Sequence, residues 1–151
     1  MNLKIKNKIA LITGASRGLG ESICKSLAKE GVKIIACSRN KKDLSKLISS
    51  LPNKKKHFLF DCDLANKSHL HDLIENIKRK NISPDIIVNN VGGNLGYNDP
   101  LGPSTEFRKV MYLNVEVAIE LNRAFIPRMI KKKWGRICHI SSISALENQG
   151  S

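Results

Sequence analysis

Short apolar runs alternate with amphipathic segments along the chain. Runs at residues 8–13, 33–38, 57–61 and 84–90 are almost continuously apolar, which is typical of strands buried on both faces of a sheet. A further strand-like run, GRICHIS, begins at residue 135. Between the runs, apolar residues recur three or four positions apart and predict helices over residues 18–31, 41–51, 68–80 and 104–130.

This alternation predicts an α/β fold: a Rossmann-type, doubly wound parallel sheet with helices on both faces and right-handed crossovers. Pro127 lies inside the last helical pattern and is expected to interrupt it. We find no linker or internal repeat, so residues 1–151 are interpreted as one domain. Ligands of such sheets bind beyond the carboxyl ends of the strands, where the unusual polar residues of this chain fall.

Composition narrows the classes of protein. The hydrophobic share of 41% fits a globular protein, and no apolar run approaches the roughly 20 residues of a membrane span. The net charge of +13 is spread along the chain, and its lysine runs at 54–56 and 131–133 lack interleaved aromatic residues. We therefore expect a solvated basic surface and no specific nucleic-acid or membrane partner. The cysteines are Cys24, Cys37, Cys62 and Cys138, and their spacing does not match that of metal ligands, so no metal site is predicted. We expect them to be buried free thiols of a protein in the cytoplasm.

A glycine-rich segment, TGASRGLG, joins the first strand to the first helix at residues 13–20. Gly14 permits a tight turn, Gly18 lets the backbone approach a pyrophosphate, and Gly20 lets the helix pack closely on the strand. The helix N-terminus offers free N–H groups and a favourable dipole to an anion. A plain glycine turn is the alternative. We predict that this loop binds a dinucleotide through Gly14, Ala15, Ser16, Arg17, Gly18, Leu19 and Gly20.

The residue after the second strand indicates which nicotinamide cofactor binds. An NAD site places an acid about 20 residues past the glycines, where it bonds the ribose 2′-hydroxyl. This chain has Arg39 there, and Arg39 can pair with a 2′-phosphate, joined by Arg17 from the glycine loop. We therefore predict NADP(H), with a plain surface cation as the alternative interpretation of Arg39.

The TGxxxGxG spacing resembles the short-chain dehydrogenase/reductase family, and the likeness covers the whole chain. The segments NNVGG at 89–93, YLNVEV around Asn114 and GRICHISS follow in the order of the family's motifs, with Val91 in place of the usual alanine. The closest general likeness is to bacterial 3-oxoacyl-acyl-carrier-protein reductases. The resemblance implies that residues 1–151 are the N-terminal, NADP-binding part of a short-chain dehydrogenase/reductase domain, without the family's last strands.

Further site residues follow from the resemblance alone. It implies that Asp63 and Leu64 lie beside the adenine, and that Asn90 and Gly92 lie along the ribose of the cofactor. Substrates would be small carbonyl or hydroxyl compounds, with 3-oxoacyl thioesters as one candidate, in a pocket along residues 92–103 and 143–151. The family forms homodimers and homotetramers through the long helix and the helix after it.

Two catalytic residues are expected on the same basis. Ser142 would hydrogen-bond the substrate oxygen, with Ser141 pointing to the opposite face of the strand. Asn114 would position a water in a proton relay, and a purely structural amide is the alternative. Asn114 falls on an apolar stripe of the long helix and is therefore expected to be buried with hydrogen-bond partners; the stripe comprises Phe107, Val110, Met111, Val117, Leu121 and Ala124.

The family's acid catalyst is a tyrosine four residues before a lysine, whose charge lowers the tyrosine pKa. Leu101 and Glu116 stand four residues after Tyr97 and Tyr112, so neither tyrosine fits. At the usual spacing the pair would fall just beyond Ser151. We expect the 151 residues to be an inactive part of a longer enzyme. The alternative is a remnant that binds NADP(H) as a sensor or scaffold without catalysis.

Overall fold

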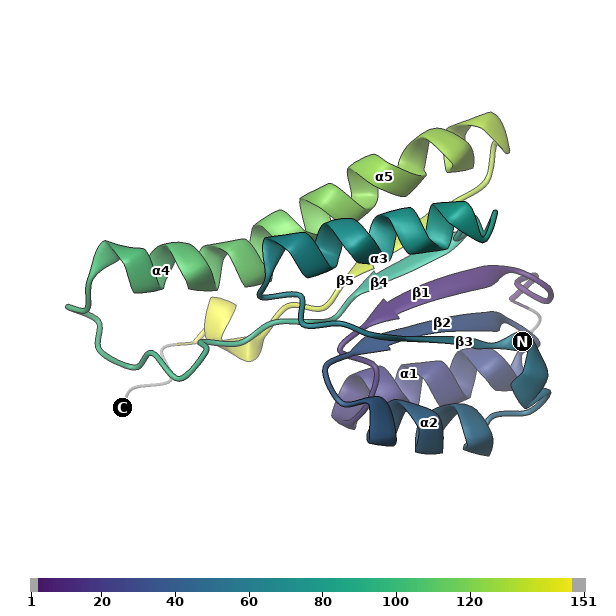
Figure 1. Ribbon diagram of the computed structural model, residues 1–151, viewed down its shortest axis with the longest axis horizontal. Coiled ribbons are helices and arrows are strands. Elements are labelled where there is room, and N and C mark those ends of the chain that lie inside the picture. Colours follow the sequence, from purple (N-terminus) through teal and green to yellow (C-terminus); the bar gives the residue numbers. More distant parts are fainter. Residues whose placement is uncertain (1–2, 148–151) are drawn as a thin grey trace.

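In the computed structural model, which describes residues 3–147, five strands form one sheet in the order β3-β2-β1-β4-β5 (Figure 1). Every neighbouring pair in this order runs parallel. The predicted parallel, Rossmann-type sheet is therefore confirmed. The strands are β1 (Ile9–Thr13), β2 (Lys33–Ser38), β3 (Phe58–Asp61), β4 (Ile86–Asn89) and β5 (Arg136–His139).

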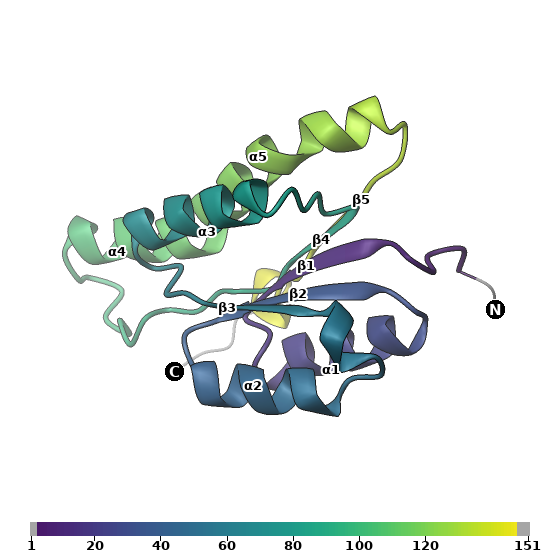
Figure 2. The ribbon, with the colours of Figure 1, turned by 45° about the vertical axis from the view of Figure 1, so that its right-hand side comes forward.

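Helices cover both faces of the sheet, as Figures 1 and 2 show. One layer holds α1 (Gly18–Lys29) and α2 (Lys41–Ser50), and the other holds α3 (Lys67–Arg79) and α5 (Val117–Lys131). The long helical segment begins with α4 (Ser104–Met111), and a π-helical turn, η2 (Tyr112–Glu116), joins α4 to α5. Short 3₁₀ turns are η1 (Lys54–Lys56) and η3 (Ile143–Ala145).

The central strands are apolar on both faces because each face supplies a separate core. Leu11 of β1 packs with the α3 and α5 residues, whereas its neighbours Ala10 and Ile12 pack with the α1 and α2 residues. Successive side chains of a strand point to opposite faces, so an uninterrupted apolar run is required where both faces are covered. This is the physical reason that the strand pattern predicts a doubly wound sheet.

The expected interruption at Pro127 is wrong. The helix α5 continues through Pro127 to Lys131. The proline is exposed and lies near the end of the helix, so the carbonyl group that loses its N–H donor can bond water instead. The irregular turn lies earlier, at η2, where no proline or glycine marks it in the sequence.

The expected apolar stripe is only partly buried. Val117 and Leu121 lie in the core, but Phe107 is 65% and Met111 is 40% exposed. The reason is visible in Figure 1, in which α4 extends past the carboxyl ends of the strands and so has no sheet beneath it. Cys138 is likewise exposed and not buried as expected, because β5 is an edge strand of the described sheet.

Within residues 3–147, no helix combines the length and the apolar character needed to cross a bilayer.

Asp85 ties the amino-terminal ends of two neighbouring strands to the carboxyl-terminal end of a helix. Its side chain is only 9% exposed. The carboxylate accepts hydrogen bonds from the backbone N–H of Ile9 at 3.1 Å and from Nζ of Lys132 at 2.8 Å. The backbone carbonyl of Asp85 accepts from the N–H of Arg136 at 3.0 Å. One residue thus fixes β1, the end of α5 and β5 relative to β4.

Replacing Asp85 with alanine is expected to lower the free energy of unfolding by about 2–3 kcal/mol, because a partly buried N–H group and Lys132 both lose a charged acceptor. Urea denaturation would measure the loss. Alanine at the exposed Lys131 is the control, and we expect it to change stability by less than about 0.5 kcal/mol. Equal stabilities of the two variants would contradict the assigned role of Asp85.

Candidate functional site

The glycine loop between β1 and α1 has the shape that a phosphate site needs. Gly14 and Gly18 have φ values of +63° and +55°, a left-handed conformation that glycine adopts without strain. A Cβ built at Gly18 would meet nothing within 4 Å, so the backbone there is open to an approaching group. The helix α1 begins at Gly18, and the N–H groups of a first helical turn have no partner within the helix.

Gly20 and Ala15 shape the loop from inside. A Cβ at Gly20 would lie 2.2 Å from the carbonyl oxygen of Gly14, so only glycine lets α1 pack this closely on the turn. Ala15 is fully buried, and its N–H donates to the carbonyl of Cys37 at 3.0 Å. These two predicted site residues do not line the cleft above the loop. Their placement points to a supporting role.

The other predicted cofactor residues lie around one cleft of about 650 Å³, at the carboxyl ends of the strands. The cleft runs from the glycine loop past the end of β2 to the segment after β4. Its volume falls within the range of small-molecule sites. The predicted residues among those that line it are Gly14, Ser16, Arg17, Gly18, Leu19, Arg39, Asp63, Leu64, Asn90 and Gly92.

Two arginines mark one end of this cleft. Ser16 of the glycine loop and Ser38 at the end of β2 share a hydrogen bond of 2.7 Å, which joins the segments carrying Arg17 and Arg39. Both arginines are exposed. Among residues 3–147, neither guanidinium group has a hydrogen bond or an ion pair, so their planar donors are available to a bound anion.

Thr13 is a site residue that the sequence analysis missed. Its hydroxyl group accepts from the N–H groups of Asn90 and Val91, both at 2.9 Å, and donates to the carbonyl of Val88 at 3.3 Å. The side chain of Asn90 in turn donates to the carbonyl groups of Thr13 at 2.9 Å and Gly14 at 3.3 Å. The sequence signal was a hydroxyl residue ending an otherwise apolar strand. Together Thr13 and Asn90 brace the glycine loop against the segment after β4.

Asn114 lies in the π-helical turn and is exposed, not buried as expected. Its neighbours Tyr112 and Leu113 in the same turn are buried in the core, whereas Asn114 lies on the side of the turn that faces the loop after β4. The amide nevertheless has its partners: Oδ1 accepts from the N–H of Gly93 at 3.0 Å, and Nδ2 donates to the carbonyls of Gly93 and Val110, both at 2.8 Å. Asn114 thereby fixes the backbone after β4. Irregular π turns are frequent at functional sites.

A second cavity of about 560 Å³ adjoins the cofactor cleft and shares residues 90–93 with it. Asn114 and Ser142 both line this cavity, so the structure brings the two predicted catalytic residues to one site. Ser141 also lines it; β5 ends at His139, so strand alternation no longer separates the two serines. Ser142 Oγ accepts from the N–H of Ser144 at 3.2 Å. Of the expected pocket segments, Gly92 and Gly93 line the cavity, whereas residues 148–151 lie outside the described residues.

Neither tyrosine is placed to act as the acid beside Ser142. Burial, with the charge of Glu116, raises the pKa of Tyr112, and its hydroxyl group is buried without a partner among residues 3–147. The Tyr97 hydroxyl accepts from Nζ of Lys109 at 3.3 Å and does not line the cavity. The cavity therefore holds a hydroxyl donor in Ser142 but no phenol.

The sequence and the fold are similar to those of known proteins. The family model described as short chain dehydrogenase matches residues 8–151. The chain belongs to the short chain dehydrogenase family. It is 35% identical over 143 residues to an NADPH-dependent pterin aldehyde reductase of Arabidopsis thaliana, covering 93% of this chain and 59% of the relative. It is 39% identical over 139 residues to a 3-oxoacyl-acyl-carrier-protein reductase of Rickettsia typhi, covering 90% and 54%.

A solved structure shares the fold of this short chain dehydrogenase. A 7α-hydroxysteroid dehydrogenase, complexed with NADH and 7-oxo glycochenodeoxycholic acid, superposes with a TM-score of 0.85 at 29% identity, covering 97% of this chain and 57% of that one. The chain thus spans between half and three-fifths of the length of these proteins. It is a member of an oxidoreductase family in which both NADPH and NADH are used, which supports a nicotinamide cofactor.

The contact between Gly92 and Asn114 gives a specific prediction. A Cβ at Gly92 would lie 2.6 Å from Oδ1 of Asn114, so Gly92→Ala is expected to cost about 1–3 kcal/mol of stability. In an Asn114→Ala background that oxygen is gone, and the same change should cost at least about 0.5 kcal/mol less. A double-mutant cycle by urea denaturation measures the difference. Identical costs in the two backgrounds would show that the contact carries no energy.

Proposed function

We propose that this short chain dehydrogenase binds NADP(H) in the cleft above its glycine loop and forms the cofactor-binding part of a carbonyl reductase. The observation that carries the proposal is the pair Arg17 and Arg39, which line the cleft and have no partner among residues 3–147; Arg39 stands where an NAD site has an acid. The open backbone at Gly18 and the free N–H groups of α1 suit a pyrophosphate. The residues present therefore fit the cofactor.

Each part of the cleft has a distinct task in this proposal. Arg39 and Arg17 pair with the 2′-phosphate, and the loop after β3, with Asp63 and Leu64, lies beside the adenine. Asn90 and Gly92 lie along the ribose. The bound cofactor supplies or accepts hydride, and the residues of the chain orient it toward the cavity that contains Ser142.

The cavity residues act on the second reactant. Ser142 donates a hydrogen bond to the oxygen of a carbonyl compound, which stabilises negative charge as it develops there. Asn114 holds the backbone of Gly93 at the boundary between cleft and cavity and positions a water for proton transfer. Small carbonyl or hydroxyl compounds are the substrate class, and a 3-oxoacyl thioester is the first one to test because a 3-oxoacyl reductase is 39% identical.

We place self-association on the long helical segment, where exposed apolar residues form a row with a spacing of four residues: Phe107, Met111, Val115 and Ile119. Such a row suits a contact with a second copy of the chain in a homodimer or homotetramer.

We place the protein in the cytoplasm, because its free thiols are typical of a reducing compartment.

A second candidate function is NADP(H) binding without turnover. The placement of the tyrosines favours it for these 151 residues, because Tyr112 is buried and Tyr97 lies outside the cavity that holds Ser142. The phenol that the family's chemistry uses would then come from outside the printed sequence or be absent from the protein.

One preparation tests both candidates. The purified 151-residue chain is titrated with NADPH and then assayed with NADPH and a 3-oxoacyl thioester, following nicotinamide absorbance. We expect saturable binding and no oxidation of NADPH. Turnover by a clean preparation would contradict the assignment of these residues as catalytically incomplete. Absence of binding would contradict the cofactor assignment itself.

A further inference from the structure

One cysteine, Cys37, lies near the end of β2, and another, Cys62, directly follows β3 at the end of the cleft proposed for the adenosine. The ladder between β2 and β3 pairs Cys37 with Phe60, and the N–H of Cys62 extends it by donating to the carbonyl of Ser38 at 2.9 Å. Cys62 is two residues beyond Phe60, so its side chain lies on the same face of the sheet as that of Cys37. Both thiols belong to the same core cluster, beneath α3.

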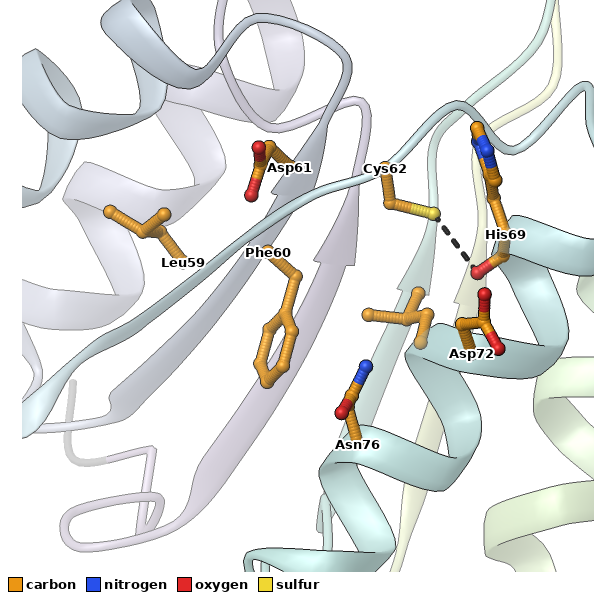
Figure 3. Close-up of a pocket in the computed structure, with 8 residues that line it drawn as sticks. Leu59, Phe60, Asp61, Cys62, His69, Asp72 and Asn76 are labelled. Carbon is orange, nitrogen blue, oxygen red and sulfur yellow. Dashed lines mark hydrogen bonds between the residues drawn. The ribbon is translucent and has the colours of Figure 1, made fainter.

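The two thiols differ in access. Cys37 is 0% exposed, whereas Cys62 is 9% exposed and lines the cofactor cleft. Cys62 also lines a smaller hollow of about 220 Å³ between β3 and α3, which Figure 3 shows. Its Sγ donates to the carbonyl of His69 at 3.3 Å, drawn as a dashed line there. A small solute can therefore reach Cys62 from two sides, whereas Cys37 lies deeper in the core and is not open to solvent.

The two thiols differ in acidity, and Cys62 is the more acidic, although the hydrogen bond that its Sγ donates to the carbonyl of His69 favours the protonated thiol. A hydrogen bond from Cys37 lowers the pKa of Cys62, although burial and the charges of Asp63, Asp61 and Asp72 oppose it. The same hydrogen bond and burial raise the pKa of Cys37 well above its ordinary value. Reactivity toward peroxides follows thiolate character and access, and both favour Cys62.

We propose that Cys37 and Cys62 are a thiol pair that a hydroperoxide oxidises to a disulfide between β2 and β3. The thiolate of Cys62 attacks the peroxide, an S–O bond forms as the O–O bond breaks, and the alkoxide or hydroxide leaves with the thiol proton as an alcohol or water. Cys37 then attacks the sulfenic acid, the S–S bond forms, and a water leaves with the second thiol proton. Two thiols are oxidised, and one peroxide is reduced.

The disulfide would act on the cofactor site through its two loops. Cys37 lies two residues before Arg39, and Cys62 directly precedes Asp63 and Leu64. Cys62 lies two residues beyond the ladder partner of Cys37, so closing the sulfurs to the roughly 2.05 Å of a disulfide shifts the ends of these two paired segments relative to each other. This consequence rests on the proposed function: oxidation lowers affinity for NADPH, and bound cofactor slows oxidation. Formation of the disulfide does not depend on it.

The test treats the purified chain with hydrogen peroxide, blocks the remaining thiols and maps peptides by mass spectrometry without reduction. We expect a linked pair of peptides that contain Cys37 and Cys62, with a loss of two hydrogen atoms from the intact mass. The Cys37→Ser variant should instead accumulate a sulfenic acid at Cys62, trapped by dimedone. The control Cys138→Ser removes an exposed thiol on β5 and should leave the linked pair unchanged.

Several results would overturn the proposal. One is a Cys62 driven to sulfinic acid while Cys37 stays free. Another is oxidation confined to Cys138, and a third is no dimedone adduct in the Cys37→Ser variant. A separate arm adds NADP⁺ at about 100 times its dissociation constant, which should slow the reaction about 100-fold by depleting the free form. A disulfide that forms at the same rate with NADP⁺ would contradict the proposed cofactor site but not the proposed thiol pair.

Discussion

Replacing Gly20 with alanine is expected to abolish NADPH binding and to lower the free energy of unfolding by about 3 kcal/mol. The new Cβ would lie 2.2 Å from the carbonyl oxygen of Gly14 and 2.8 Å from Nδ2 of Asn90. Neither atom can give way, because the first belongs to the backbone and the second is held by two hydrogen bonds to the turn. Urea denaturation and titration calorimetry with NADPH measure the two effects.

Gly18→Ala is the matched control for this prediction. A Cβ at Gly18 meets no atom within 4 Å, so the change costs only the left-handed backbone conformation, about 1–2 kcal/mol. The variant should fold but bind NADPH weakly, because its methyl group stands where the pyrophosphate approaches the loop. A Gly20→Ala variant as stable as Gly18→Ala would contradict the packing role of Gly20.

The second large effect concerns the choice of cofactor. Replacing Arg39 with alanine is expected to weaken NADPH binding about 10- to 150-fold, the equivalent of the 1.5–3 kcal/mol of a hydrogen bond to a charged group. Binding of NADH should stay the same, since NADH lacks the 2′-phosphate. Arg39→Asp should go further and favour NADH, because a carboxylate accepts from the ribose 2′-hydroxyl and repels a phosphate. Calorimetric titrations with both cofactors measure the ratio.

Arg39 is exposed and forms no ion pair among residues 3–147, so neither variant should unfold the protein. Arg108→Ala is the control, because Arg108 is an exposed arginine on α4 that does not line the cleft. It should leave both affinities unchanged. Equal losses of NADPH and NADH affinity in Arg39→Ala would show that Arg39 acts as a general cation and does not read the 2′-phosphate.

Local chemistry explains which features were predictable from the sequence. The strands could be predicted because a sheet covered on both faces requires continuous apolar runs, as in β1. The glycine loop could be predicted because positive φ values, as at Gly14 and Gly18, are a local property of the chain that glycine permits. The family motifs then gave Asn114 and Ser142, which the fold brings to one cavity.

The remaining features depend on contacts between distant segments. The π turn at η2 has no local marker, and Asn114 in it is exposed and bonds Gly93 on the loop after β4. The bracing role of Thr13 depends on Asn90, which is 77 positions away. The burial of Tyr112 and the exposure of Phe107 likewise depend on where the long helix passes the edge of the sheet. Periodicity within one helix cannot reveal that edge.

Calorimetric titration of the folded chain with NADPH and with NADH, at one salt concentration, tests the account most directly. We expect saturable binding of NADPH that is at least about tenfold tighter than that of NADH. A folded sample that binds NADH as tightly as NADPH, or gives no heat with either, would contradict recognition of NADP(H) by the glycine loop and Arg39.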